Sequence, residues 1–437
     1  MKRVVLVSLE HVGAAMAGPG IRYYNFAREL AKAHEVTLVV PNEDTGTVEG
    51  VEVVPRPSLS RRALRELCLG ADAVVAQHLT VDLMRRLADS PVRAIYDLYV
   101  PFATENLALH ASGRRRYSDY AYRAGNLHQR EALANGNSFL CASERQRDLW
   151  LGALAAAGRV ELDAYERDPS LRDLIDVVPF GLDPAPPEPT RPVVKGAVDG
   201  IAEQDKVLLW GGGIWNWFDP LTPIRAAERL ARRRDDVKLF FLGVRHPNPG
   251  VPEMARASEA MALADSLGLT GKFVFFNHGW VPYHERHAYF READLGISAH
   301  FDTVETRFAF RTRLLDHFAA GLPSLVTGGD VLGDLVAVRG AGRTVGVVDV
   351  DGWVEAIESL LDDDNAYTAA VAATAPLREE LAWTAVVRPL LRLVELPGEA
   401  VATRSGPDAL LRAWALTAGQ AVTNPRLAVE VARRRWR

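Results

Sequence analysis

Residues 295–326 read LGISAHFDTVETRFAFRTRLLDHFAAGLPSLV. The stretch opens and closes with short apolar runs, Leu295–Ser298 and Ser324–Val326, which have the length of buried strands. Between them a helical pattern covers Arg311–Ala320, and Gly321-Leu-Pro323 brings it to an end. A strand, a helix and a second strand in this order predict a parallel sheet that is covered by helices on both faces.

The same alternation extends in both directions and predicts a doubly wound domain over residues 205–406. Its other strands are expected at Val207–Trp210, Lys238–Leu242, Phe273–Phe276 and Thr344–Val348. Its other helices are expected at Thr222–Arg233, Pro252–Leu267, Tyr283–Glu292 and Trp353–Leu361.

An earlier series predicts a first domain of the same kind over residues 1–183. Its strands are expected at Arg3–Ser8, Glu35–Val40, Val51–Val54, Ala73–Gln77, Arg93–Leu98, Ser138–Ala142 and Ile175–Pro179. Its helical patterns include Ile21–Ala33, Arg61–Leu69 and Val81–Ala88. A long charged helical stretch, Glu105–Asn135, is expected to lie outside the sheet layers.

A proline-rich segment separates the two series, with five prolines in residues 184–192. This composition predicts a stiff linker, which we extend over residues 184–204. The final helical stretch, residues 407–437, is too short for a third domain and is expected to pack back on the first. The predicted fold class is therefore α/β, with two Rossmann-like doubly wound domains that face a cleft and a C-terminal helix that packs back.

Composition narrows the class of protein. The 437 residues contain 51 basic and 56 acidic side chains, a net charge of −5, so no basic field argues for a nucleic-acid partner. The two cysteines, Cys68 and Cys141, exclude a disulfide scaffold and fit a reducing compartment. The first apolar run, Val4–Val7, is too short for a signal peptide, and no apolar stretch approaches the ~20 residues that span a bilayer. We expect a cytoplasmic protein.

Ligands of open α/β sheets bind beyond the carboxyl ends of strands, so the informative residues should follow strands. The first candidate is Ser8–Arg22, which runs from a strand into a helix and contains Gly18 and Gly20. These glycines let the backbone approach a ligand, and the helix amino end attracts anions. Neither a Walker A pattern nor the dinucleotide fingerprint is present, so the glycines either bind a donor or only shape the loop.

Two further candidates follow strands of the second domain. In Trp210–Pro220, Gly212 and Gly213 expose backbone N–H groups that suit a pyrophosphate, and Trp215 favours a pocket nearby. The alternative is a packing corner relieved by glycine. Farther along, Gly279 and Trp280 can clamp a flat base between backbone and ring, or they form a plain tight turn.

The fourth candidate is the loop within the quoted stretch. Arg307, Arg311 and Arg313 crowd a helix amino end, where cations oppose the helix dipole unless an anion is bound. Arginine pairs with phosphate through two donors, so the loop predicts a phosphate clamp. Asp316 lies about one and a half turns after Arg311, within reach of ribose hydroxyls. Apolar neighbours, Phe310 among them, disfavour the alternative of a solvated charged loop.

Four stretches together resemble one family, the retaining glycosyltransferases with the two-Rossmann GT-B fold, of the family-four type that uses nucleotide sugars. The resemblance covers nearly the whole chain. The most recognisable stretch is Leu315–Pro323, LDHFAAGLP. The others are Gly18–Ala31, then Tyr96–Leu98 with Glu105, and then Ala142–Gln146 with Val177–Asp183.

The chain departs from the family pattern at the donor site. The family's paired glutamates, seven residues apart, fall at Phe308 and Asp316 here, and the glycines usual between them are Ala309 and Arg311. The nearest upstream carboxylate is Glu305, to which the sugar-binding role passes.

The family's basic residues after the second domain's first strand are absent as well. We infer that an arginine of the loop, Arg307, Arg311 or Arg313, neutralises the phosphates instead.

The resemblance implies transfer of a sugar from a nucleotide-diphosphate sugar to a hydroxyl acceptor with retention, without a metal or other cofactor. The enzyme's work would be positioning and charge stabilisation, assigned to Asp97, Glu305 and Arg311. Asp97 and Glu105 are candidates for gripping acceptor hydroxyls. The setting would be polysaccharide biosynthesis for a cell-surface glycan, or secondary-metabolite (antibiotic) biosynthesis.

Three other functions fit the residues. A sugar-nucleotide epimerase of the same fold would act without an acceptor, and a coupling enzyme of that fold would join non-sugar cyclitols. A catalytically silent sugar-nucleotide-binding subunit is favoured by the absence of a glutamate at Phe308.

Two basic–aromatic clusters, Arg114–Tyr117 and Val431–Arg437, bear on location. Basic residues are attracted to anionic lipid, so the clusters predict peripheral contact with the inner membrane surface and a lipid-linked acceptor. The alternative is a solvated loop and a frayed terminus, with a small soluble metabolite as acceptor.

Overall fold

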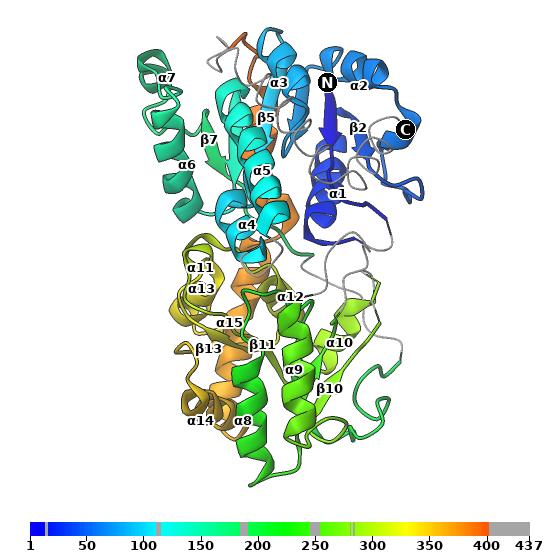
Figure 1. Cartoon of the computed structure of the whole chain (residues 1–437), viewed down its shortest axis with the longest axis vertical. Helices are drawn as coiled ribbons and strands as arrows, with labels where there is room; N and C mark the ends of the chain where they lie inside the picture. The colour runs from blue at the N-terminus through cyan, green and yellow to red at the C-terminus, as the bar shows by residue number, and fades with distance from the viewer. Residues whose placement is uncertain are drawn as a thin grey trace. The chain divides into compact units, whose positions relative to one another are not determined.

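The computed structural model describes residues 1–13, 16–110, 115–183, 191–244, 254–279, 281–282 and 285–401. They fall into two compact units (Figure 1). The first contains Met1–Pro179 and the segment that begins at Val386, and the second contains Phe180–Ala385.

The first unit holds a seven-stranded parallel sheet in the order β3-β2-β1-β4-β5-β6-β7. Its strands are β1 (Arg3–Val7), β2 (Glu35–Val40), β3 (Val51–Pro55), β4 (Ala73–Ala76), β5 (Arg93–Asp97), β6 (Ser138–Cys141) and β7 (Ile175–Val177). In the centre, Leu6 lies in register with Leu38 on one side and Val75 on the other. All three side chains are fully buried, as expected for a parallel sheet covered on both faces.

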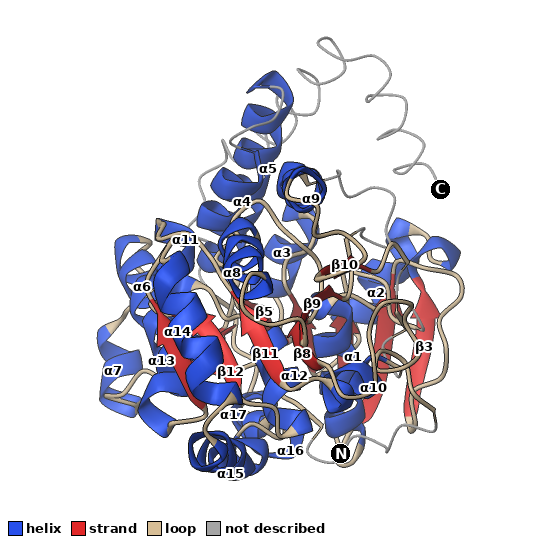
Figure 2. Ribbon diagram, turned by 90° about the horizontal axis from the view of Figure 1, so that it is seen from below, coloured by secondary structure: helices blue, strands red, loops and turns tan. Residues whose placement is uncertain are grey.

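Helices connect these strands and cover the sheet. They are α1 (Gly18–Ala31), α2 (Arg61–Leu69), α3 (Val81–Ala88), α4 (Phe102–His110), α5 (Arg115–Asn135), α6 (Glu144–Ala156) and α7 (Leu162–Arg167), with a short 3₁₀ turn at Arg56–Ser58. The expected long helix Glu105–Asn135 is therefore two helices, α4 and α5, and α5 contacts α3 and β5. Figure 2 shows helices on both sides of the strands.

The second unit holds a six-stranded parallel sheet in the order β10-β9-β8-β11-β12-β13. Its strands are β8 (Lys206–Trp210), β9 (Val237–Phe241), β10 (Val274–Phe276), β11 (Leu295–Ser298), β12 (Ser324–Thr327) and β13 (Gly342–Val345). Its helices are α8 (Leu221–Ala231), α9 (Ala255–Ser266), α10 (Arg286–Glu292), α11 (Val304–Phe308), α12 (Arg313–Ala320), α13 (Val331–Arg339), α14 (Val350–Leu361) and α15 (Asp364–Glu380). Helix α8 contacts α9 and α14, whereas α12 contacts α10 and α15, which gives two helical layers.

The described part of the expected linker lies in the second unit. Val194 and Ile201 are buried in its core, and residues 184–190 lie outside the described residues. The Glu292 carboxylate accepts hydrogen bonds from the backbone N–H groups of Val193 and Val194, both at 2.8 Å. These bonds hold residues 193 and 194 against α10. The part of the expected linker that follows Pro192 is therefore packed on the second unit.

The second unit ends at Ala385 rather than at residue 406, because the chain returns to the first unit through α17 (Arg388–Glu395), which contacts β5 and β7. The short α16 (Trp383–Val386) lies where the chain passes from the second unit to the first. The Lys2 ammonium donates to the carbonyls of Val394 and Glu395, both at 2.8 Å, and so caps the carboxyl end of α17. The predicted helix 407–437 lies outside the described residues.

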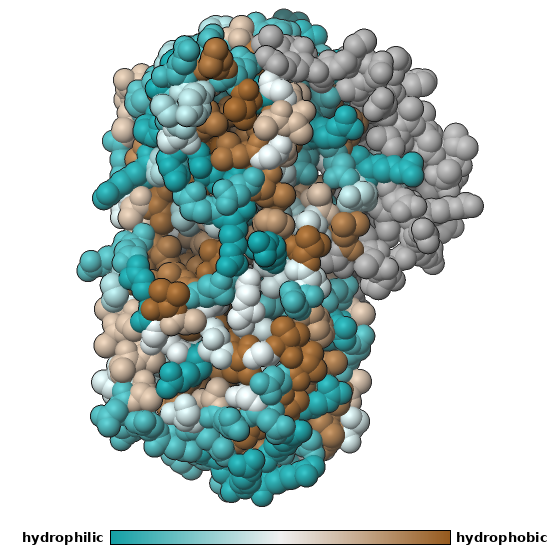
Figure 3. All heavy atoms as spheres, turned by 90° about the vertical axis from the view of Figure 1, so that its left-hand side faces the viewer, coloured by the Kyte–Doolittle hydropathy of each residue, from teal (hydrophilic) through white to brown (hydrophobic). Residues whose placement is uncertain are grey.

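The described residues include no helix that is long and apolar enough to cross a membrane. Exposed large apolar side chains are scattered along them, at Leu162, Tyr165 and Val338 for example. Figure 3 shows separate apolar patches within a largely hydrophilic face. The side chains of both basic–aromatic clusters lie outside the described part of the chain, so membrane contact stays a prediction.

Candidate functional site

The strand order of the second sheet reverses between β8 and β11, and ligands of such sheets bind beyond the carboxyl ends of the strands at this point. The loops that follow these two strands are joined to each other. Phe218 forms an antiparallel bridge with His300, and the Asp219 N–H donates to the Ala299 carbonyl at 2.9 Å. Two stretches chosen from the sequence, 210–220 and 299–326, therefore meet at the expected ligand edge.

The glycines after β8 leave room beside the backbone. Gly212 has φ +121°, which disfavours any side chain, and a Cβ placed there would meet nothing within 4 Å. Gly213 presents its carbonyl to Arg313, whose Nη2 donates at 2.8 Å. Trp215 is half-buried and stacks on Trp217, with ring centroids 5.2 Å apart. Gly211, by contrast, is packed closely, because a Cβ there would lie 2.3 Å from the Phe290 ring. Diphosphate binding by Gly212 and Gly213 stays a prediction.

Arg313 is a buried cation next to this glycine loop. Its guanidinium lies over the rings of Trp210 and Phe218, at 4.8 and 3.9 Å from their centroids. Burial, assisted by the neighbouring Arg311, lowers the pKa of Arg313 to about 9. Its Nη1 has no hydrogen-bond partner among the described residues. Because an unpaired buried donor is unfavourable, an anion at this position would be stabilised.

Arg311 has a different environment from Arg313. Its Nη1 and Nη2 donate to the two carboxylate oxygens of Glu305 at 2.8 and 2.7 Å, and both side chains are buried. Glu305 lies in the first turn of α11, which Thr303 caps. The structure thus brings two predicted catalytic residues together, but it directs the terminal nitrogens of Arg311 to a carboxylate. Phosphate binding by Arg311 stays a prediction.

Two residues that are not among the predicted site residues, Asp330 and His300, form a buried cluster with Arg311 and Glu305. Asp330 follows β12, and its Oδ2 lies 3.0 Å from His300 Nε2 and 3.8 Å from Arg311 Nε. A signal for Asp330 was present: an aspartate that follows two glycines and precedes an apolar helical run is typical of a helix N-cap. Nothing in the local sequence indicates its link to Arg311.

Asp316, the predicted ribose ligand, is half-buried in the first turn of α12. Arg286 of α10 donates from Nη2 to its Oδ1 at 2.8 Å. Burial raises the pKa of Asp316, and Arg286 counteracts that shift. Its Oδ2 accepts no bond from the described residues. One carboxylate oxygen is therefore fixed in place, and the other is available to a hydroxyl.

The other described donor candidates of the second unit are less buried than Arg311 and Arg313. Phe310 is half-buried, and Arg307 is exposed at the end of α11. Gly279 is exposed, and its N–H donates to Asn277 Oδ1 at 3.1 Å. Trp280 lies outside the described residues.

Gly18 and Gly20 lie in the first unit, whereas the other predicted donor residues lie in the second. Both glycines are in the first turn of α1. A Cβ on Gly20 would come within 2.1 Å of the His11 carbonyl oxygen, so this residue lets the helix pack on the preceding loop. The packing explains Gly20 without a ligand, and the donor role of both glycines stays a prediction.

Asp97, the predicted acceptor ligand, ends β5 and is fully buried at its side chain. Arg22 of α1 donates to it from Nε at 2.7 Å and from Nη2 at 2.9 Å, and its Nη1 donates to the Pro179 carbonyl at 3.0 Å. Both carboxylate oxygens of Asp97 are therefore occupied. Glu105 is half-buried in α4. Acceptor binding by Asp97 stays a prediction, and it now requires the ion pair to open or to act through Arg22.

Helix α12 also holds a neutral histidine. Burial, and to a lesser extent Arg313, lowers the pKa of His317 from its ordinary 6.5 to about 3. Its Nδ1 lies 3.0 Å from the Ser324 hydroxyl. The unfolded chain therefore binds a proton at a pH at which folded His317 remains neutral.

We expect this difference to make the stability of the protein depend on pH. The contribution of neutral His317 is complete above about pH 6.5 and is lost as the pH falls toward about 3, by about 1 kcal/mol for each pH unit. His317→Gln removes the titrating group and keeps a partner for Ser324. Urea denaturation at several pH values should show a shallower acid dependence for this variant, and equal slopes would contradict the buried neutral state.

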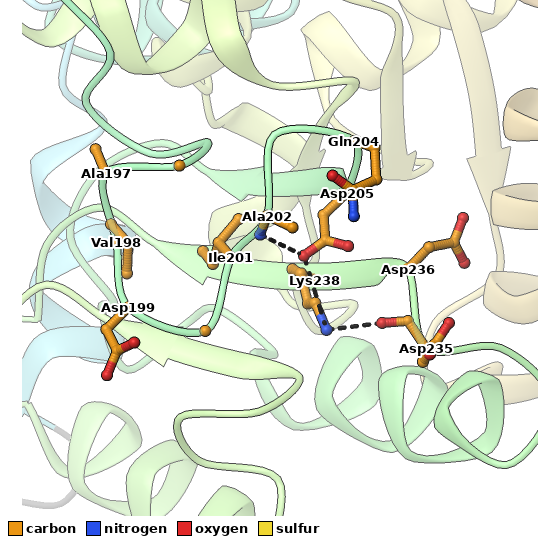
Figure 4. A pocket seen from close by; sticks show the side chains of 12 residues that line it. Ala197, Val198, Asp199, Ile201, Ala202, Gln204, Asp205, Asp235, Asp236 and Lys238 are labelled. Carbon is orange, nitrogen blue, oxygen red and sulfur yellow. Dashed lines mark hydrogen bonds and ion pairs between the residues drawn. The ribbon is translucent and has the colours of Figure 1, made fainter.

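A cavity of about 770 Å³ lies elsewhere in the second unit. Residues that precede β8 and β9 line it, so it is at the amino ends of the strands, opposite to the ligand edge. Figure 4 shows Lys238 directed toward Asp205 and the Asp235 carbonyl, which lies 2.7 Å from its Nζ. These contacts satisfy the ammonium, and the cavity lies opposite to the edge at which ligands of such sheets bind. Within the described ranges, no three His, Cys, Asp or Glu side chains gather as metal ligands.

No family model and no curated protein matches the chain. Solved structures do. The chain is similar to WaaG, a glycosyltransferase involved in lipopolysaccharide biosynthesis, at 16% identity and a TM-score of 0.61, over 90% of this chain and 99% of that one. It is also similar to Anabaena HepE in complex with UDP and glucose, at 13% identity and a TM-score of 0.61, over 91% and 100% of the two chains.

A third similar structure is sucrose-phosphate synthase from Thermosynechococcus elongatus, at 14% identity and a TM-score of 0.58, over 90% and 98% of the two chains. At these identities the likeness shows the fold alone. The two parallel sheets flanked by helices have the GT-B architecture, and the predicted α/β class with two Rossmann-like domains is confirmed.

Proposed function

We propose that the protein is a glycosyltransferase that moves a sugar from a nucleotide-diphosphate sugar to a hydroxyl acceptor. The observation that carries the proposal is the position of Arg313 next to the Gly212–Gly213 loop, at the ligand edge of the second sheet. Its buried Nη1 has no hydrogen-bond partner among the described residues. A buried cation beside an open glycine loop suits a diphosphate. One of the similar structures, Anabaena HepE, is a complex with UDP and glucose.

In this proposal each part of the donor has a partner in the second unit. Arg313 and the N–H groups of the glycine loop bind the diphosphate, and Oδ2 of Asp316 accepts from a ribose hydroxyl. Glu305, held by Arg311, binds the sugar. Gly279, which is exposed, is the candidate contact for the base.

We further propose that transfer retains the anomeric configuration and needs no metal. The leaving diphosphate oxygen takes the proton of the acceptor hydroxyl as the new glycosidic bond forms on the same face of the sugar. The positive charge of Arg313 stabilises the departing diphosphate, so the residues act by position and charge. Acceptor binding is assigned to Glu105 of α4 and to the Arg22–Asp97 pair at the carboxyl end of β5. A cytoplasmic location and a cell-surface glycan or secondary metabolite as product belong to the same proposal.

A silent sugar-nucleotide-binding subunit is the second candidate. It is favoured by Phe308 at the family's glutamate position and by the occupation of both Glu305 oxygens by Arg311.

A panel of nucleotide sugars, incubated with the protein with and without hydroxyl acceptors, separates the candidates. Release of the free sugar or transfer with retained configuration supports the transferase. Formation of an epimer supports an epimerase, transfer of a non-sugar cyclitol supports a coupling enzyme, and binding without turnover supports the silent subunit.

Arg313→Met is expected to weaken nucleoside diphosphate binding by about tenfold to a hundredfold, because a charge-assisted contact contributes about 1.5–3 kcal/mol. Binding of the corresponding nucleoside should change little. Calorimetric titration of both ligands measures the difference. Arg343→Met is the matched control, because Arg343 is an exposed arginine of β13 in the same unit. Equal weakening of the two ligands would show that Arg313 does not contact phosphate.

A further inference from the structure

Asp330 connects three segments at the ligand edge of the second sheet. Its Oδ1 accepts from the N–H groups of Leu332 and Gly333, at 2.9 and 2.8 Å, and so caps α13. Its Oδ2 faces His300, from the loop after β11, and Arg311, which lies just before α12. The carboxylate therefore serves both as a helix cap and as a partner of the buried cluster.

The cluster is almost sealed from solvent. Asp330 is 2% exposed, His300 1%, Arg311 6% and Glu305 4%. Arg311 Nε and His300 Nε2 have no well-aligned hydrogen bond within the described chain, and Asp330 Oδ2 is 3.8 Å from the first and 3.0 Å from the second. In a buried setting, the charges of Asp330 and Arg311 interact strongly at this distance.

We propose that Asp330 is a positioning residue for the donor sugar. Its negative charge lies on the Nε side of the Arg311 guanidinium, while Glu305 occupies Nη1 and Nη2. Because Arg311 lies between two carboxylates, it keeps its ion pair with Glu305 when a diphosphate binds. The diphosphate is then bound by Arg313. Asp330 thereby sets the direction of the Glu305 carboxylate. The inference rests on the proposed function, because it assigns Glu305 to the sugar.

Asp330→Asn separates this role from helix capping. Asparagine caps a helix about as well as aspartate, so the contact with α13 survives. The charge next to Arg311 is lost, and the amide places an N–H donor or a neutral oxygen where the carboxylate was. Asp363→Asn is the matched control, because Asp363 caps α15 in the same way, accepting from the N–H groups of Asn365 and Ala366 at 2.9 and 3.1 Å, and is exposed. Asp330→Ser is a second variant that keeps a capping oxygen and removes the charge.

Three quantities are measured for the wild type and the variants: the melting temperature, the affinities for a nucleoside diphosphate and for the intact nucleotide sugar, and kcat/KM for sugar release. For Asp330→Asn and Asp330→Ser we expect kcat/KM to fall by about a hundredfold, the scale of a small misplacement of a reacting group. Affinity for the nucleotide sugar should fall while affinity for the nucleoside diphosphate is kept, and the Asp363→Asn control should match the wild type.

Other outcomes overturn the inference in distinguishable ways. If Asp330→Asn behaves like Asp363→Asn, then Asp330 only caps α13. If both Asp330 variants unfold while the control folds, the residue is structural. If the affinities for the two ligands fall together, it does not act through the sugar. If the wild type binds no nucleotide sugar at all, the proposed function fails and the inference fails with it.

Discussion

Replacing Arg22 with methionine is expected to lower the free energy of unfolding of the first unit by about 3–5 kcal/mol. The substitution leaves Asp97 as a fully buried carboxylate whose two partners, Nε and Nη2 at 2.7 and 2.9 Å, are gone. It also removes the guanidinium from the faces of Phe26 and Tyr99, which lie 4.4 and 4.7 Å away. The isolated carboxylate lies at the carboxyl end of β5, an inner strand of the sheet.

Amide hydrogen exchange measures this effect without assuming that both units unfold together. Peptides from β1, β4 and β5 should exchange faster in Arg22→Met, and peptides from the second sheet should not. Arg62→Met is the control: Arg62 is 79% exposed at its side chain and pairs with Glu66, and such surface pairs contribute about 0–1 kcal/mol.

A double variant tests the cause. Arg22→Met combined with Asp97→Leu removes both charges, so much of the lost stability should return. If Arg22→Met alone exchanges as slowly as the wild type, the ion pair is not needed for stability. A direct role of Asp97 in acceptor binding would then become the better explanation for the residue.

The sheets could be predicted from the sequence because buried parallel strands are short apolar runs, whatever the rest of the fold does. The expected Leu295–Ser298 is the observed β11, and the expected Val207–Trp210 differs from β8 by one residue. Strand ends also indicated the ligand edge, and Gly212, Arg313 and Asp316, which local sequence selected, follow strands of the second sheet. Their donor roles stay predictions. Chain organisation was harder. The return of α17 depends on contacts such as the one between Lys2 and Val394, 392 residues apart, that no local pattern encodes.

The partners of the site residues were not predictable for the same reason. Arg22 meets Asp97 across 75 residues, and Arg313 meets the Gly213 carbonyl across 100. The sequence shows that arginines crowd the start of α12, but only packing decides which of them is paired. It assigns Arg311 to a carboxylate and leaves one nitrogen of Arg313 without a partner in the described structure.

Arg311→Met is therefore expected to act in a different way from Arg313→Met. It leaves Glu305, which is 4% exposed, as a buried carboxylate without its two donors, and we expect a loss of about 3–5 kcal/mol in the second unit. We also expect turnover of the nucleotide sugar to disappear, because Glu305 loses its fixed direction. Hydrogen exchange over α11 and β11 reports the stability, and sugar release reports the turnover.

Combining Arg311→Met with Glu305→Gln removes the isolated charge, so stability should largely return while turnover stays lost. Recovered stability in this pair would show that the loss in Arg311→Met came from the isolated Glu305 carboxylate. If Arg311→Met instead folds like the wild type and loses about tenfold or more in nucleoside diphosphate affinity but not in nucleoside affinity, its guanidinium leaves Glu305 for the phosphates when the donor binds. Arg311 would then be the phosphate ligand that its sequence position indicates, and Glu305 would be its resting partner.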